Sequence, residues 1–413
     1  MICARLTQWR RHVPVATANR PSAESGVADA GRNSYYAPRL RAAIVGTGGI
    51  SRIHGWRLQD LGSTVVGVCG RDVTKARSVA NDFRPSGQTG DQAGHISASS
   101  PVGAFDDLGT MLDETKPDVV HVCSPHGFHA AHAIETVKRG INVIIEKPMA
   151  TDEADAQALI AAAKDTGVHA AVCLTKRSYP MVAELRARIL AGELGQVNAI
   201  RGGFMSWDSN HDNWSWGFDP KIAGTSYATA DLGVHWLDLA EYVTGRRITE
   251  VDARFSTLRP TRYSNGQPVN VEAEDYVRIF LDFTGGAVGS ATFSGVTAGE
   301  PNGCSIDVDG TDGAFHWKVD RPNEIVHRRA DGSVGTIIRN PDAMAASAAR
   351  LSFSPAGHAE GFGDAFRNLI RDVYSAIGGA DVCYPTLADG YRMVSIVKAI
   401  QTSAQTRRAV SVD

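Results

Sequence analysis

The chain has 413 residues, of which 43% are hydrophobic and 21% charged, and its formal net charge is -3. This length exceeds what one hydrophobic core usually organises, so we expect two domains. The nearly balanced charge argues against nucleic acid or an anionic membrane as a partner. The sequence contains no apolar run of about 18 residues, the length that a helix needs to cross a bilayer. Six scattered cysteines without a CxxC pair indicate reduced thiols and a cytoplasmic protein.

Residues 1–38 carry several arginines among small polar residues and show no apolar periodicity. Arg10 and Arg11 would suit a twin-arginine export signal, but residues 12–19 are a poor apolar core for one. We therefore interpret residues 1–38 as a disordered or non-native N-terminal extension and leave them out of the fold prediction.

Short apolar runs that alternate with helical patterns predict a first domain over residues 39–174. Strands are expected at 42–45, 64–69, 118–123, 142–145 and 169–174, and helices at 49–61, 72–82, 130–139 and 152–163. Such apolar strands indicate a parallel sheet covered on both faces, the doubly wound Rossmann arrangement of an α/β protein. Residues 84–101, rich in Gly, Ser and Gln, are expected to form an exposed loop.

The pattern changes at residue 175, where a second, α+β domain is expected to begin and to extend to residue 413. Strands are expected at 197–203, 248–255, 275–283, 287–293, 305–308 and 314–318. Glycine-rich turns between several of them favour a large, mostly antiparallel, open-faced sheet. A helix is expected at 181–191, and helices at 229–243, 359–376 and 387–402 are expected to lie on one face of this sheet.

A glycine-rich turn joins the first strand to the first helix. Gly46, Gly48 and Gly49 are followed by Ile50, with Ser51 in place of the third glycine of a GxGxxG turn. Gly46 permits the tight turn, Gly48 has no side chain to block a pyrophosphate, and the helix points its free amides at the phosphates. This context predicts a dinucleotide-binding site.

The end of the second strand bears on the choice of cofactor. NAD sites usually place an acid there to hold the ribose 2′-hydroxyl, whereas this chain has Gly70, Arg71 and Asp72. The arginine favours a 2′-phosphate, so the prediction is NADP over NAD. Two alternatives remain open: Asp72 turning inward, and Arg71 stacking on the adenine.

Two further segments carry candidate catalytic groups. Lys147 follows the 142–145 strand, at an edge where ligands bind in such sheets, and its charge would lower the pKa of a substrate hydroxyl. Asp231 and His235 are four residues apart and would share one face of a helix, where the carboxylate could orient the imidazole as a general base. A structural Asp–His pair is the alternative interpretation.

The order and spacing of these motifs resemble the Gfo/Idh/MocA oxidoreductases over roughly residues 40–405. The resemblance is carried by Gly46–Ile50 with His54, Ser124-Pro125 with His129, Glu146-Lys147-Pro148, and Asp231-x-Gly233-x-His235-x-x-Asp238. Segments 179–182, 192–195 and 357–361 are similar to the inositol- and sugar-dehydrogenase members. Residues 224–230 depart from the family because they contain one glycine where many members carry a cluster.

The resemblance implies a hydride transfer between NAD(P) and a sugar, anhydrosugar or inositol-type polyol. Lys147 would contact substrate beside the nicotinamide, and His235, oriented by Asp231, would accept the proton. The residues implied around the cofactor are Gly46, Gly48, Gly49, Ile50, Arg71, Ser124, Pro125, His129, Glu146 and Lys147. The open sheet face would build a homodimer or homotetramer.

Substrate specificity is expected in the second domain, where aromatic and polar side chains together would suit a carbohydrate. The candidates are Arg177, Trp207, Trp214 and His358, with Lys176, His211 and Trp216 beside them. No metal site is expected, because Asp, Glu and His show no tight ligand spacing and hydride transfer needs none.

Two other functions are kept as alternatives. One is an NAD-dependent glycosidase of the same fold, which would release a free sugar with no net change in its cofactor. The other is a cofactor-binding sugar sensor without turnover, against which the presence of Lys147, Asp231 and His235 together argues.

Overall fold

The computed structural model describes residues 37–83, 101–207 and 211–412. The extension expected at residues 1–38 lies almost wholly outside this part of the chain, as does most of the loop expected at 84–101. No helix in the described part is long and apolar enough to span a membrane.

The first sheet contains six parallel strands in the order β3-β2-β1-β4-β5-β6. The strands are β1 (Arg41–Val45), β2 (Thr64–Cys69), β3 (Gly103–Phe105), β4 (Val119–Val122), β5 (Asn142–Ile145) and β6 (Ala170–Val172). From β1 the chain adds β2 and β3 on one side and then returns to add β4, β5 and β6 on the other side. β1 and β4 therefore flank the switch point, where ligands bind in doubly wound sheets. The predicted Rossmann arrangement is confirmed.

Both faces of this sheet are buried. Along β1, Ala43 and Val45 face a core shared with α3 (Leu108–Thr115), α4 (His129–Val137) and α5 (Glu153–Thr166), while Ala42 and Ile44 face a core shared with α1 (Gly49–Asp60) and α2 (Val73–Asn81). Successive side chains of a strand point to opposite faces. Burial on both sides therefore explains why the strands read as continuous apolar runs.

The second sheet contains nine strands in the order β16-β15-β14-β13-β7-β12-β11-β8-β17. They are β7 (Val197–Met205), β8 (Ile248–Ser256), β11 (Tyr276–Phe283), β12 (Val288–Ser294), β13 (Gly303–Gly310), β14 (Gly313–Lys318), β15 (Glu324–Arg329), β16 (Val334–Ile338) and β17 (Val410–Ser411). Every pair is antiparallel except β7 with β12. The prediction of a large, mostly antiparallel sheet is thus confirmed; β9 (Thr261–Ser264) and β10 (Gln267–Asn270) form a separate hairpin.

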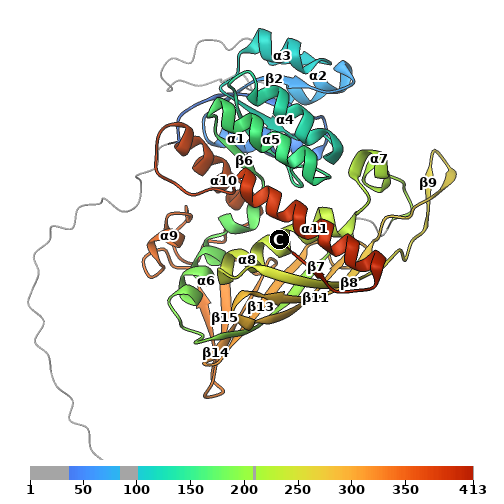
Figure 1. Ribbon diagram of the computed structural model, residues 1–413. Helices are drawn as coiled ribbons and strands as arrows, with labels where there is room; N and C mark the ends of the chain where they lie inside the picture. Colours follow the sequence, from blue (N-terminus) through green and yellow to red (C-terminus); the bar gives the residue numbers. More distant parts are fainter. Residues whose placement is uncertain (1–36, 84–100, 208–210, 413) are drawn as a thin grey trace, which may run out of the picture. The chain divides into compact units, whose positions relative to one another are not determined.

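The helices of the second half do not all cover this sheet as expected. α8 (Val234–Thr244) packs on β7 and β13, and α11 (Leu387–Thr406) packs on β8 and also reaches α5 and β6 (Figure 1). α10 (Phe362–Ile377) instead packs against α1 and completes the core on one face of the first sheet. The prediction for α10 was wrong because its apolar residues, Phe366 to Tyr374, complement the first sheet.

The remaining helices are short or lie near the site. They are α6 (Pro180–Leu190), α7 (Pro220–Ala223), α9 (Ala346–Ala349), the 3-10 turns η1 (His126–Phe128), η2 (Thr175–Ser178), η3 (Trp216–Phe218) and η5 (Thr284–Gly286), and the π-helical turn η4 (Thr229–Gly233). The predicted domain boundary after residue 174 stays a prediction, since α10 and α11 contact elements of the first half.

Candidate active site

A cavity of about 880 Å³ opens at the carboxyl ends of the strands of the first sheet. The segments that follow β1, β2, β4 and β5 line it, and so do Ser215 to Gly217, Tyr227 and Asp231 from the second half of the chain. The cavity therefore lies at the topological switch point, where an open parallel sheet binds its ligands.

The glycine turn after β1 leaves this cavity open. Gly46 has φ +123°, and a Cβ built on it would lie 2.3 Å from the carbonyl oxygen of Cys123. A Cβ on Gly48 or Gly49 would meet no atom within 4 Å. Gly48 also begins α1 without a side-chain cap, so the first amides of the helix stay available for a phosphate. These features fit a dinucleotide.

The end of β2 presents cations to the cavity. Arg71 and Lys75 both line it. Asp72 is the N-cap of α2, and its Oδ1 accepts hydrogen bonds from the amides of Thr74 (2.9 Å) and Lys75 (3.3 Å). Asp72, the acid that could otherwise hold a ribose hydroxyl, is thus engaged in capping a helix.

Ser124, Pro125 and His129 all line the cavity after β4. The His129 ring lies between two main-chain carbonyl oxygens, with Nε2 2.5 Å from that of Ser124 and Nδ1 2.7 Å from that of Pro148. It therefore connects the loops that follow β4 and β5, and so positions the segment that contains Lys147.

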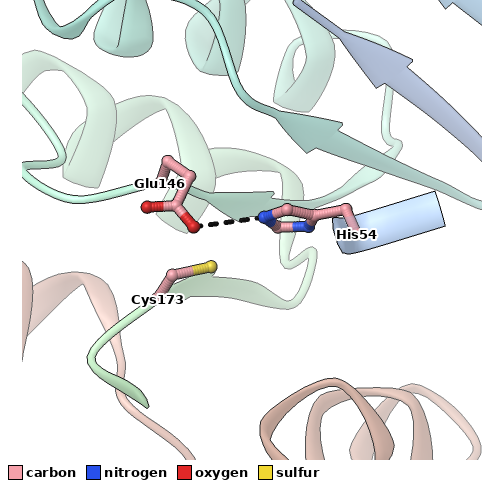
Figure 2. Close-up of side chains that lie close together, drawn as sticks. All are labelled: His54, Glu146 and Cys173. Carbon is pink, nitrogen blue, oxygen red and sulfur yellow. Dashed lines mark hydrogen bonds and ion pairs between the residues drawn. The ribbon is translucent and has the colours of Figure 1, made fainter. Parts of the chain in front are cut away.

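Glu146 is held by a buried hydrogen-bond chain. Figure 2 shows its carboxylate directed at the His54 ring, with Nε2 to Oε1 3.2 Å apart. His54 Nδ1 lies 2.7 Å from His121 Nδ1, and His121 Nε2 lies 2.8 Å from the Tyr374 hydroxyl. One assignment of protons satisfies all three contacts, with each group donating toward Glu146. Tyr374 belongs to α10, so the C-terminal half helps to position Glu146.

The carboxylate of Glu146 also accepts the Lys147 amide at 3.1 Å. Burial raises its pKa, but the bond from His54 and nearby charges outweigh this and lower the pKa overall. His54, Glu146 and Cys173 offer ligand atoms within 4.8 Å of one another, close enough for a metal ion (Figure 2). Burial and then Glu146 raise the pKa of the Cys173 thiol, whereas a bound metal ion would lower it. His54 and Glu146 also form a hydrogen-bonded support for the Lys147 segment.

Lys147 and Asp231 meet at the cavity wall. Lys147 Nζ donates to Asp231 Oδ1 at 2.5 Å and to the Asp231 main-chain oxygen at 2.9 Å. Burial lowers the pKa of Lys147, but Asp231 and Glu146 outweigh it and raise the pKa overall. Burial raises the pKa of Asp231, but the Lys147 ammonium brings it down to about 2. Both groups are therefore charged at neutral pH.

His235 is placed differently from expectation. Asp231 pairs with Lys147, and no hydrogen bond joins Asp231 to His235 in the described part of the chain. His235 does not line the cavity, and its Nδ1 is buried without a partner. Burial, then Lys147 and Lys176, hold its pKa well below 6.5, so the imidazole is neutral. Lys147 occupies the Asp231 carboxylate, and the expectation that Asp231 orients His235 stays a prediction.

His126 is a site residue that sequence reasoning missed. It lines the cavity, its Nε2 lies 3.9 Å from Asp231 Oδ1, and the Trp216 ring packs edge-on against it at 4.9 Å between centroids. Burial lowers its pKa to about 3, so this imidazole is also neutral. The available signal was its position directly after Ser124 and Pro125, at the end of a central strand.

The four substrate candidates do not line the cavity. Arg177 forms ion pairs with Asp238 and Asp389 instead. Trp207 is half-exposed, and His358 is exposed in a turn whose main-chain oxygen accepts a bond from Arg339. Trp214 and His211 are likewise absent from the lining, whereas Trp216 is part of it. Trp207 and Trp214 stay predictions as substrate contacts, because the sequence does not report which ring turns toward the cavity.

Comparisons with known proteins agree with this geometry. Residues 40–173 match the model of an oxidoreductase family with an NAD-binding Rossmann fold, and residues 182–316 match that of the GFO/IDH/MocA C-terminal domain. The chain is 28% identical over 330 residues to levoglucosan dehydrogenase of Pseudarthrobacter phenanthrenivorans, covering 74% of this chain and 83% of that protein.

Solved structures show the same likeness. A structure of levoglucosan dehydrogenase with NADH and levoglucosan superimposes with a TM-score of 0.80 at 25% identity, covering 90% of this chain and 99% of that one. An inositol dehydrogenase homologue from Azotobacter vinelandii, complexed with NAD+, gives 0.80 at 23% identity, covering 92% and 99%, and shares the fold.

Proposed function

Because this chain belongs to the Gfo/Idh/MocA family of NAD-binding oxidoreductases, we propose that it transfers hydride between a nicotinamide cofactor and a hydroxyl- or keto-bearing carbon of a sugar, anhydrosugar or inositol-type polyol. The observation that carries the proposal is the Lys147–Asp231 pair. It lies on the wall of the same cavity that the open glycine turn lines. A reacting hydroxyl and a dinucleotide would therefore share one space.

Each side chain then has a definite task. A bound nicotinamide supplies the hydride acceptor. Lys147 Nζ donates a hydrogen bond to the reacting oxygen and stabilises the negative charge that develops there. Asp231 holds that ammonium in place and keeps it charged. His235 is proposed as the proton acceptor on the strength of the family resemblance alone, because its ring does not line the cavity and its pKa is held well below 6.5.

We propose NADP as the preferred cofactor. Arg71 and Lys75 both line the cavity beyond β2, while Asp72 is engaged as a helix cap. Arg71 and Lys75 suit a 2′-phosphate better than a ribose hydroxyl, and they line the cavity together with the carboxylates of Asp106 and Asp107. Arg71→Ala should lower kcat/KM with NADP by about tenfold or more, while kcat/KM with NAD changes much less. An equal loss with both cofactors would contradict the preference.

Trp216 would supply an apolar face for the sugar ring, since it lies on the cavity wall beside His126. Cytoplasmic location and assembly as a homodimer or homotetramer are part of the same proposal, on the strength of the family resemblance. The proposal includes no nucleic acid or membrane partner.

The test is reduction of NADP and NAD by the purified protein, followed by absorbance, with a panel of inositols, aldoses and anhydrosugars. Lys147→Met should lower kcat by about a hundredfold or more, while NADPH binding, followed by fluorescence, remains. Wild-type turnover retained in this variant would exclude the assigned role. Release of sugar from a glycoside without net cofactor reduction would instead favour the glycosidase.

A further inference from the structure

A buried carboxylate, Glu274, fixes the segment that leads into the π-helical turn η4. It lies two residues before β11 and is 2% exposed. Its Oε1 accepts hydrogen bonds from the Ser226 hydroxyl (2.6 Å) and from the amide and hydroxyl of Thr229 (3.0 and 2.9 Å). Its Oε2 accepts the Tyr227 amide at 3.2 Å, and its main-chain oxygen accepts the Ala228 amide at 3.1 Å. We call these contacts, from Glu274 to residues 226–229, the Glu274 clamp.

The clamp suits an ionised carboxylate. Burial raises the pKa of Glu274, and the bonds from Ser226 and Thr229 lower it again in part. All four groups that reach the carboxylate are donors, so a protonated Glu274 would set two donors against each other. A change that removes the charge but keeps the size of this side chain should therefore release the segment.

The clamp is joined to the active site by direct contacts. Residues 224–230 contain one glycine, so hydrogen bonds rather than glycine content fix the course of this segment. Tyr227, whose amide the clamp holds, lines the cavity. The main-chain oxygen of Tyr227 accepts the Asp231 amide at 2.8 Å. One hydrogen bond therefore separates the clamp from the residue that pairs with Lys147.

The π-helical turn begins at Thr229, inside the clamp, and contains Asp231. The Val234 amide donates to the Thr229 carbonyl oxygen, five residues back, which is the bond of a π turn. Such a turn holds one residue more than an α turn, so a return to α geometry would rotate the chain on one side of it by about 100°. α8, which follows, is fixed because nine of its eleven residues are buried. The rotation would therefore fall on Asp231 and carry its carboxylate away from Lys147.

We propose that Glu274 is a positioning residue, which maintains the π-helical turn and so holds Asp231 against Lys147. This rests on the proposed function, in which Lys147 donates to the reacting oxygen. Without the clamp, the ammonium loses the partner that holds it in place, so kcat falls. Cofactor affinity depends on the glycine turn after β1 and should change little.

The first test needs no turnover. In guanidinium unfolding, Lys147→Met and Asp231→Asn should be coupled by about thirtyfold in the equilibrium constant of the otherwise wild-type protein. In a Glu274→Gln background the coupling should fall to within about threefold, because the glutamine NH2 group faces donors. Coupling of the full size in that background would overturn the proposal, and so would its absence from the wild-type protein.

Thr229 gives a second, milder pair of variants, which decides the question if Glu274→Gln does not fold. Thr229→Val keeps the shape and removes the hydroxyl that donates to Glu274, whereas Thr229→Ser keeps the hydroxyl. Valine should lower the coupling between the Lys147 and Asp231 substitutions by about threefold or more, and serine should retain it. Equal coupling in the two variants would count against the clamp.

The second test measures turnover of a panel sugar that the wild-type protein oxidises. Glu274→Gln should lower kcat by about tenfold or more, while the Kd for NADPH stays within about threefold. The matched control is Glu184→Gln on α6, because Glu184 is also 2% exposed and accepts a main-chain amide, from Ala345 at 2.8 Å, besides its ion pair with Arg188. This control should keep both the coupling and kcat.

The outcomes separate the positioning role from a structural one and from the reaction itself. An equal loss of kcat in Glu274→Gln and Glu184→Gln would reflect lost stability alone and would overturn the positioning role. A wild-type protein that oxidises no panel sugar would count against the proposed reaction. The coupling measured by unfolding would still decide whether Glu274 holds Asp231 against Lys147.

Discussion

The Lys147–Asp231 pair should contribute measurably to the stability of the fold. Burial raises the pKa of Asp231, but the lysine lowers it from the ordinary 3.8 to about 2. At about 1.36 kcal/mol for each unit of pKa, this corresponds to about 2 kcal/mol of folding free energy at neutral pH. The side chains are 16% and 28% exposed, so solvent screens the pair only in part.

A double-mutant cycle with Lys147→Met and Asp231→Asn isolates the free energy that the ion pair contributes to folding. Asparagine keeps the shape and a hydrogen-bond acceptor, so the cycle reports the loss of charge. Guanidinium unfolding at pH 7, followed by tryptophan fluorescence, should give a coupling free energy of about 2 kcal/mol. Because the pKa is lowered in the folded state, the stabilisation is present above about pH 4 and is lost as the pH falls toward about 2. A coupling below about 0.5 kcal/mol would place the pair among ordinary surface ion pairs and refute this reasoning.

Three further outcomes follow from the geometry. Gly46→Ala should lower the free energy of unfolding by about 2 kcal/mol or more, because its Cβ would meet the Cys123 carbonyl oxygen at 2.3 Å. Gly48→Ala should keep the wild-type free energy of unfolding and lose NADH affinity. The opposite pattern would contradict the role of the glycine turn in binding a dinucleotide. Maleimide should label the exposed Cys383 in native protein and leave buried Cys123 unlabelled in peptide maps, and rapid labelling of Cys123 would argue against its burial. Phe366→Ala, at a side chain 1% exposed, should cost about 3–5 kcal/mol of unfolding free energy; a loss below about 1 kcal/mol would show that α10 does not complete the first core.

The buried parallel strands of the first sheet and the glycine turn could be predicted because their causes are local. Strands buried on both faces must be apolar throughout, and a turn at φ +123° requires glycine, so both leave a direct mark in the sequence. The placement of Lys147 at a strand end followed from the same pattern.

The partners of the charged residues could not be predicted, because they lie far apart in the chain. Asp231 is 84 residues from Lys147, and Arg177 is 61 residues from Asp238 and 212 from Asp389. A motif read locally joined Asp231 to His235, four residues away, and left Arg177 free for substrate. Pairing is decided by tertiary packing, so spacing within one helix was insufficient evidence.

The packing of α10 on the first sheet has a consequence for how the protein is made. The last strand of that sheet ends at Val172 and α10 begins at Phe362, so 189 residues separate them. At a synthesis rate of about 5–20 residues per second, the ribosome needs roughly 10–40 s to deliver the helix. During that interval α1 and α2 cover the apolar face of the nascent sheet that includes Ile44 and Val68, and the contribution of α10 is still missing. Folding of the first half is therefore expected to finish only after the chain is nearly complete.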